Sequence, residues 1–268
     1  MADIRRRMWS VAGLLAAATL SSGLLTTAAN ASDRDASAAK VPPIVGGQPA
    51  KIADHPWVVY LTDTQGNQFC GGTLAKANKV VTAAHCVSGE KPETVQVVAG
   101  REDKQTSEGK VAKVTGIWVH PNFQNANSGA DVAVLTLDQE LPQQPLAVAG
   151  KGDTSLYEVG KTSAVLGWGA TAEGGQASQT LQKAEVPLVS DQECQKAYPQ
   201  YKSDAMVCAG LPQGGVDSCQ GDSGGPLVVE NKLVGIVSTG NGCARPNAPG
   251  IYTRVATYHD DVQAQLGS

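Results

Sequence analysis

Short runs of β-branched and apolar residues recur along most of the chain. Glycine, asparagine, proline and aspartate separate them, a pattern typical of short strands joined by turns. The runs cover residues 57–61, 95–99, 111–119, 163–166 and 233–238. Another run, residues 131–137, is predicted to be a buried strand that begins with one carboxylate. The pattern therefore predicts an all-β fold, with thirty glycines to serve its tight turns.

The two ends of the chain carry different patterns. Residues 255–266 have helical spacing and predict one helix at the C-terminus. Residues 1–10 hold three arginines, and an apolar run over 11–29 ends in Ala-Asn-Ala. This is the pattern of a secretory signal peptide, residues 1–31, cleaved after Ala31. A transmembrane anchor is the alternative, but Thr, Ser and Gly interrupt the run and small residues close it.

A short polar segment that ends in proline, residues 32–43, follows the leader and is predicted to be a propeptide. The mature chain, 44–268, is long enough for a packed core. Five of the 21 Lys and Arg and three of the 25 Asp and Glu lie in the first 43 residues, which leaves a net charge of −6. An acidic surface disfavours nucleic acid and anionic membrane as partners.

All six cysteines belong to the mature part of the chain. An even number of cysteines behind a signal peptide predicts disulfides, although six cysteines allow fifteen pairings. Metal binding is the alternative, but the chain has no Cys-x-x-Cys pair and no other spacing typical of metal ligands. The sequence therefore favours three disulfides and a secreted, extracellular protein.

Residues 221–226, Gly-Asp-Ser-Gly-Gly-Pro, surround Ser223 with flexible backbone. A serine hydroxyl attacks a carbonyl only when a base is adjacent, and that base must be oriented by a third group. His85, in Thr-Ala-Ala-His-Cys at 82–86, is the best base in the sequence. Asp131 is the best third group, because a buried carboxylate needs a partner. Together these residues predict hydrolysis of peptide bonds.

The order of these residues separates two kinds of hydrolase. Residues 221–225 also fit Gly-x-Ser-x-Gly, the nucleophile elbow of α/β-hydrolases. Those enzymes run Ser, Asp or Glu, then His, whereas only Glu230, His259 and the adjoining acids follow Ser223. The observed order, His then Asp then Ser, is that of the chymotrypsin type.

Five segments resemble the chymotrypsin-family serine proteases. They are Ile-Val-Gly-Gly at 44–47, Thr-Ala-Ala-His-Cys at 82–86, Asp-Val-Ala-Val-Leu at 131–135, Gly-Trp-Gly at 167–169 and Gly-Asp-Ser-Gly-Gly-Pro at 221–226. The similarity runs from residue 44 to about 258, and Asp-Ser-Cys-Gln-Gly-Asp at 217–222 is most similar to the trypsin-like, secreted bacterial (Streptomyces-type) members.

The resemblance implies two six-stranded antiparallel Greek-key β-barrels with the active site in the cleft between them. The first barrel would cover residues 44 to about 150 and the second about 151–254, before the helix at about 255–266. We expect the divide between residues 141 and 160. The family pattern also pairs the cysteines as Cys70 with Cys86, Cys194 with Cys208 and Cys219 with Cys243.

The resemblance assigns roles to the site residues. His85, Asp131 and Ser223 would be the catalytic triad of a serine endopeptidase that acts through an acyl-enzyme. The backbone N–H groups of Gly221 and Ser223 would bind the oxyanion, and glycine at 221 lets the backbone approach the substrate. Asp217, six residues before Ser223, would form the floor of a pocket for Arg or Lys.

The resemblance also assigns residues to the walls of that pocket. Gly240 and Gly250 match two wall positions, and the Ser218 hydroxyl can accept from a lysine ammonium. The family usually has Ser-Trp-Gly where residues 238–240 read Ser-Thr-Gly, so Ser238 should still pair with an extended substrate while more distant preferences are open.

Activation in the family inserts a new N-terminus, here that of Ile44, beside the acid before the nucleophile, here Asp222. Proline at 43 departs from zymogens cut after Arg or Lys, so we expect another protease to mature this chain as a zymogen.

No cofactor is expected to be required. Glu102, Asp103 and Glu108 could hold calcium, but without an Asp-x-Asp-x-Asp-Gly pattern a solvated turn is favoured. We expect protein or peptide substrates, protein protease inhibitors as a further class of partner, and a monomer. A non-catalytic binding protein with the same fold is the alternative, against which the presence of His85, Asp131 and Ser223 argues.

Overall fold

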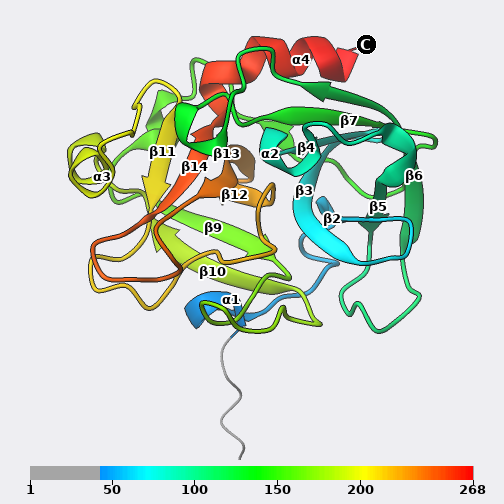
Figure 1. The fold of residues 1–268 in the computed structure, drawn as a ribbon, viewed down its shortest axis with the longest axis horizontal. Coiled ribbons are helices and arrows are strands. Elements are labelled where there is room, and N and C mark those ends of the chain that lie inside the picture. The colour runs from blue at the N-terminus through cyan, green and yellow to red at the C-terminus, as the bar shows by residue number, and fades with distance from the viewer. Residues whose placement is uncertain (1–42, 268) are drawn as a thin grey trace, which may run out of the picture. The chain divides into compact units, whose positions relative to one another are not determined.

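The computed structural model describes residues 43–267, so the predicted signal peptide and nearly all of the predicted propeptide lie outside the described residues. The described chain is mainly β, with two barrel-like sheets and a helix at the C-terminus (Figure 1). The predicted all-β fold class is therefore confirmed. In the described part, no helix is both long and apolar enough to span a bilayer.

The first sheet is a closed barrel of six antiparallel strands, in the order β2-β3-β4-β7-β6-β5. Their bounds are β2 Val58–Thr62, β3 Gln68–Lys76, β4 Lys79–Thr82, β5 Gln96–Ala99, β6 Lys110–Val119 and β7 Ala133–Leu137. Every residue of β2 and β4 is buried, because both faces of these strands pack against other parts of the protein. Closure leaves no unpaired edge, which makes this barrel a rigid support for a site.

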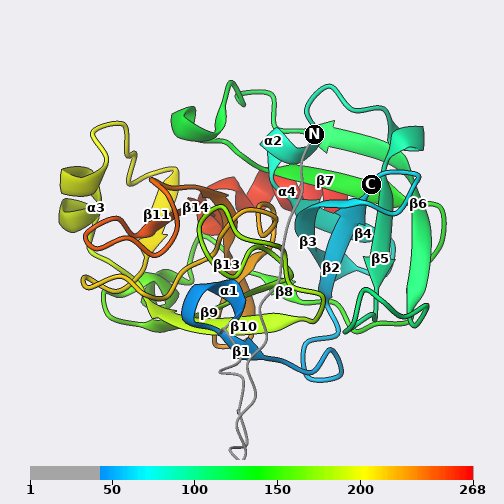
Figure 2. The ribbon, with the colours of Figure 1, turned by 60° about the horizontal axis from the view of Figure 1, so that its bottom comes forward.

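The second sheet has eight strands, in the order β1-β10-β9-β12-β13-β14-β11, and β8 pairs with β13 in parallel. Their bounds are β1 Gln48–Pro49, β8 Ala147–Val148, β9 Thr162–Gly167, β10 Gln182–Pro187, β11 Met206–Ala209, β12 Pro226–Val229, β13 Lys232–Thr239 and β14 Gly250–Arg254. Strands β1 and β8 come from the part of the chain assigned to the first barrel by sequence, yet they pair here. Figure 2 shows β1 and the short segment α1 (Pro43–Gly46) lying by β9 and β10, and within α1 the backbone angles of Ile44 and Val45 are not helical.

The helices differ from the predicted single C-terminal helix. The C-terminal segment starts as a 3-10 helix, Val255–Tyr258, and becomes α4 (His259–Gly267). Helix α3 (Asp191–Ala197) was missed, although Ser190 accepts a hydrogen bond from Glu193 N, as the Ser-x-x-Glu capping pattern at its start indicates. The short helices are α2 Ala84–Val87 and the 3-10 turns Pro92–Thr94, Ala126–Ser128 and Thr154–Tyr157.

Candidate active site

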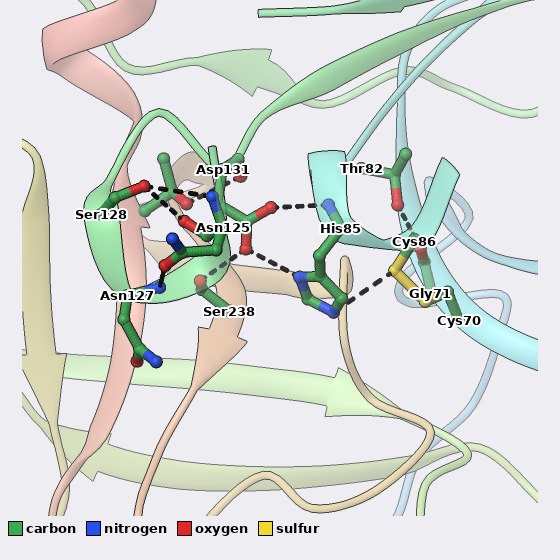
Figure 3. A network of polar contacts seen from close by, with 11 residues as sticks. Cys70, Gly71, Thr82, His85, Cys86, Asn125, Asn127, Ser128, Asp131 and Ser238 are labelled. Atoms are coloured by element: carbon green, nitrogen blue, oxygen red, sulfur yellow. Dashed lines mark hydrogen bonds and ion pairs between the residues drawn. A yellow bond between two sulfur atoms is a disulfide. The ribbon is translucent and has the colours of Figure 1, made fainter. Parts of the chain in front are cut away.

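His85 lies on α2, directly after β4, and faces Asp131 from the loop before β7 (Figure 3). The sequence predicted Asp131 as the first strand residue, whereas β7 begins two residues later at Ala133. The Asp131 Oδ2 atom lies 2.7 Å from His85 Nδ1, and Oδ1 accepts the backbone N–H of His85 at 2.8 Å. A carboxylate beside Nδ1 favours the tautomer with its proton on Nδ1, and in that tautomer Nε2 is the atom that can accept a proton.

Two hydroxyls from the second sheet complete the surroundings of Asp131, which is 1% exposed. Ser238 Oγ on β13 donates to Asp131 Oδ2 at 2.6 Å, and Thr253 Oγ1 on β14 donates to the Asp131 carbonyl at 2.8 Å. A buried carboxylate is stabilised only when donors satisfy it. No local sequence pattern indicates either contact, because more than a hundred residues separate the partners.

The segment that carries Ser223 packs directly against the first barrel. Gly71 N on β3 donates to the Ser223 carbonyl at 2.7 Å. Gly224 has φ +79°, and a Cβ there would lie 2.2 Å from Thr82 Oγ1 and 2.6 Å from the Gly71 carbonyl. Only glycine permits this approach, which brings the serine segment to the end of the strand that leads into α2.

Within residues 43–267, no hydrogen bond joins the Ser223 hydroxyl to the His85 ring. The His85 Nε2 atom instead lies 3.7 Å from Cys86 Sγ. Such nucleophile–base contacts are often long in the absence of substrate and tighten when it binds. The arrangement therefore provides an oriented base on one barrel and a half-buried serine on the loop before β12.

The backbone around Ser223 offers donors for an oxyanion. Gly221 has φ +94°, in the left-handed region that favours glycine. Among the described residues, the N–H groups of Gly221 and Ser223 make no hydrogen bond to the protein. The Gly221 carbonyl accepts a hydrogen bond from Gln68 Nε2 at 3.2 Å, which fixes the orientation of this segment from the first barrel.

A pocket of about 170 Å³ opens beside Ser223 on the second sheet. Its lining includes Asp217, Ser218, Ser223, Val237, Ser238, Thr239, Gly240 and Gly250. Asp217 is 3% exposed and accepts hydrogen bonds from Ala244 N at 3.1 Å and from Ser218 Oγ at 3.4 Å. Burial raises the pKa of Asp217 to about 6.

The two glycines predicted to be pocket walls have different surroundings. A Cβ at Gly250 would lie 2.7 Å from Asp217 Oδ1 and 3.2 Å from the Tyr252 ring, so any larger residue would displace the carboxylate. At Gly240 the only close atom would be the Gly242 carbonyl at 3.5 Å, an ordinary contact. Gly250 is therefore required by packing, and Gly240 leaves open space at the pocket.

Ile44 and Asp222 are both fully buried. Asp222 accepts hydrogen bonds from Gly169 N at 2.8 Å and Cys219 N at 3.0 Å, and burial raises its pKa to about 7. A Cβ on Gly167 or Gly169 would overlap the Asp222 carboxyl group, which explains the glycines of the Gly-Trp-Gly segment. Ile44 has φ 41°, a strained value for a β-branched residue.

The three disulfides join Cys70 to Cys86, Cys194 to Cys208 and Cys219 to Cys243, the pairing that the resemblance implied. Two of them border the site. Cys86 follows His85 in the chain, and Cys219 and Cys243 line the pocket beside Ser223. These covalent bonds hold the loops that carry the site residues in place.

Two of the three acidic side chains considered for calcium, those of Glu102 and Asp103, have other partners. The Glu102 carboxylate lies 2.8 Å from Lys51 Nζ and accepts the Ile52 N–H at 3.1 Å. Asp103 accepts the N–H of Gln105 at 2.9 Å. Arg101 Nε donates to the Glu108 carbonyl at 2.7 Å and thereby joins the two ends of this loop.

Comparison with known proteins gives one consistent result. The profile of the trypsin family matches residues 44–262. Trypsin of Saccharopolyspora erythraea is 52% identical over 225 residues, which cover 84% of this chain and 99% of that protein. Trypsin-1 of Astacus astacus is 41% identical over 238 residues, covering 82% and 99%, and trypsin eta of Drosophila melanogaster is 42% identical over 204 residues, covering 75% and 78%.

Proposed function

Because the chain belongs to the trypsin family and is therefore a trypsin-like serine endopeptidase, we propose that it cleaves peptide bonds after Arg and Lys. The observation that carries this proposal is the buried Asp217 carboxylate, which has no cationic partner among the described residues and lines the same pocket as Ser223. A guanidinium or ammonium from a substrate would supply that partner. An uncharged side chain would leave the carboxylate buried and unpaired, which costs about 3–5 kcal/mol.

In the proposed mechanism, Ser223 Oγ attacks the scissile carbonyl while His85 Nε2 takes the hydroxyl proton. His85 then gives this proton to the leaving amine, and Asp131 stays ionised and stabilises the imidazolium. The N–H groups of Gly221 and Ser223 bind the oxyanion, a contribution of roughly 3–4 kcal/mol per donor. Water then attacks the carbonyl of the acyl-enzyme while His85 takes a proton from the water. His85 gives this proton to Ser223 Oγ as the ester bond breaks, which releases the acid product and restores Ser223.

We expect the pocket to accept both basic residues. The Ser218 hydroxyl lies 3.4 Å from Asp217 Oδ1 and 3.5 Å from the Tyr252 hydroxyl. Its oxygen can accept a hydrogen bond from the ammonium of a lysine side chain, which is too short to reach Asp217 directly. Thr239 lines the pocket where the family usually has tryptophan. We propose that this change weakens contacts to substrate residues before the cleaved one and leaves the choice of Arg or Lys intact.

Ionisation of Asp217 gives the pocket a pH dependence that tests the proposal. An unfolded aspartate has a pKa of about 3.9, and burial raises the pKa of Asp217 to about 6. Its contribution to stability is therefore complete below pH 3.9 and lost as the pH rises through 6. A cationic ligand binds the ionised form, so calorimetry should show benzamidine binding about tenfold tighter at pH 7 than at pH 5.

Benzamide, the neutral isostere of benzamidine, provides the control. Its affinity should not increase over the same pH range, because it gains nothing from the carboxylate charge. An equal increase for both ligands would assign the pH dependence to rearrangement of the pocket and contradict the role of Asp217.

We propose that cleavage after Pro43 frees the amine of Ile44, which then pairs with Asp222. Both residues are buried, and among the described residues the Asp222 carboxylate has backbone donors but no cationic partner. A buried amine beside it would supply that partner. The paired amine would have a pKa raised above the free value of about 7.7–8.0, so its stabilisation is present at lower pH and lost as the pH rises through the folded pKa. Because residue 43 is proline and not Arg or Lys, we propose that a protease other than this enzyme makes the cut. The leader pattern of residues 1–31 favours secretion.

No metal ion is proposed to be required, because Lys51, Ile52 and Gln105 already engage the carboxylates of Glu102 and Asp103. Treatment of the mature enzyme with EDTA should change its Tm by less than about 2 °C, which corresponds to less than about 1 kcal/mol. Differential scanning calorimetry with and without EDTA measures this. A larger drop that added calcium reverses would show that the loop binds the ion.

A further inference from the structure

A second polar pocket, of about 370 Å³, lies on the first barrel, away from the residues that line the Asp217 pocket. Its polar lining includes Asn67, Gln68, Gln96, Arg101, Lys104 and Gln179, and no Asp or Glu lines it. The mature chain carries a net negative charge. A pocket lined by two cations is therefore unlike the average surface of this protein.

Neither cation has a carboxylate partner among residues 43–267. Lys104 Nζ donates to Gln68 Oε1 at 2.8 Å, and Arg101 donates to the Glu108 carbonyl and lies 3.5 Å from the Tyr60 hydroxyl. The neighbouring carboxylates of Asp63 and Glu102 bind Asn67 and Lys51. By contrast, seven cations elsewhere pair with carboxylates: Lys51, Lys151, Lys161, Lys183, Lys232, Arg245 and Arg254.

Lys104 is also partly buried, and its burial lowers the pKa of the ammonium group, against the attraction of Asp222. A partly buried cation without a close counter-ion loses part of its hydration, and no ion pair compensates for that loss. Perturbed ionisable groups in a pocket are candidates for binding residues. The missing element of this pocket is an anion.

The pocket is connected to the reaction centre through β3. Gln68, at the start of β3, donates to the Gly221 carbonyl and accepts from Lys104. Two residues further along β3, Cys70 is joined to Cys86, whose Sγ atom lies 3.7 Å from His85 Nε2. In the proposed mechanism His85 gives a proton to the leaving amine. The substrate residues after the scissile bond would therefore lie on the side of the site where His85 and the Cys70–Cys86 disulfide are located.

Along β3, two residues separate Gln68, which binds Lys104, from Cys70, which is joined to Cys86 beside His85. An extended substrate rises about 3.3 Å per residue, as a strand does, so it would cover this offset in two or three residues. We propose that the Arg101–Lys104 pocket binds the carboxylate of an acidic substrate residue located two or three positions after the scissile bond. This inference depends on the proposed function, because it assumes that the basic residue before the bond occupies the Asp217 pocket.

The contact joins partly exposed charges, so its expected size is moderate. A double contact of this kind should favour Glu over Gln at the same position by about three- to tenfold in kcat/KM. The preference should shrink as ionic strength rises, because salt screens exposed charges.

The test uses internally quenched peptides with one Arg, followed at the second and third positions by Glu, Gln or Lys. The mature wild-type enzyme should cleave in the order Glu, Gln, Lys. In Lys104→Met the ratio of Glu to Gln substrates should fall to near one, and in Lys104→Glu the Lys substrate should become better than the Glu substrate. Ratios are compared because loss of the Lys104–Gln68 bond can also lower activity on every substrate.

Two controls make the outcome decisive. Lys196→Met, on α3 outside this pocket, should keep the wild-type ratio. Arg101→Met provides a second pocket variant if a Lys104 variant fails to fold, and it should reduce the same ratio. A wild-type ratio of one, or a preference that both pocket variants retain, would overturn the inference while cleavage after Arg still stood. Loss of the Arg requirement itself would instead overturn the proposed function.

Discussion

Replacing Ser223 with alanine is expected to lower kcat on an arginine peptide amide by about a million-fold, as loss of the serine does in a comparable triad enzyme. The reason is chemical: without Oγ there is no atom to form the acyl-enzyme, and His85 can only activate water weakly. The residual rate would come from substrate binding and the oxyanion donors. Steady-state and single-turnover kinetics of the purified mature variant would measure it.

Benzamidine binding is the control for this variant. The side chain of Ser223 contributes only one part of the pocket wall, so affinity for a ligand held by Asp217 should stay within about threefold of wild type. Unchanged binding with lost turnover identifies a chemical role. A Ser223→Ala enzyme that retained a tenth of the wild-type kcat would contradict the assignment of the nucleophile.

The second large effect is expected from Asp217→Asn, which removes the charge and preserves the shape. On arginine and lysine substrates, kcat/KM should fall by about a hundred- to a thousandfold, the equivalent of about 3–4 kcal/mol. The neutral amide can still accept the Ala244 N–H, so the pocket should stay formed. Matched peptide amides ending in Arg, Lys and Gln would measure the change.

Stability distinguishes this effect from simple damage to the fold. Because the pKa of Asp217 is raised to about 6, its charge destabilises the empty pocket at pH 7. Asp217→Asn should therefore unfold at the same or a higher denaturant concentration than wild type at pH 7. Lower stability together with lower activity would indicate that the carboxylate is structural and not a recognition group.

The candidate site residues could be proposed from the sequence because short segments contain them. Ser223, Asp217 and Gly221 lie in one stretch and His85 in another, and the structure places Asp217 and Ser223 on one pocket and His85 beside Asp131. Asp131 was proposed from the apolar run that follows it. Its position in the loop before β7 was not predicted, because hydrophobicity alone does not distinguish a strand from the buried loop that precedes it.

Contacts between distant segments could not be predicted in this way. Nothing near Ser238 indicates that its hydroxyl binds Asp131, and nothing near Gln68 indicates that it holds the Gly221 carbonyl. The pairing of β1 and β8 with the second sheet was missed because each has only two residues, too few for a periodic pattern. Helix α3 could have been found from its capping residues.

Asp217 is proposed to select a basic residue for attack by Ser223. The most direct measurement is the relative kcat/KM of the mature enzyme, confirmed to begin at Ile44, on matched peptide amides ending in Arg, Lys, Phe and Ala. We predict a preference of at least about a hundredfold for Arg and Lys over Phe and Ala. Activity centred on Phe or Ala would contradict the role of Asp217.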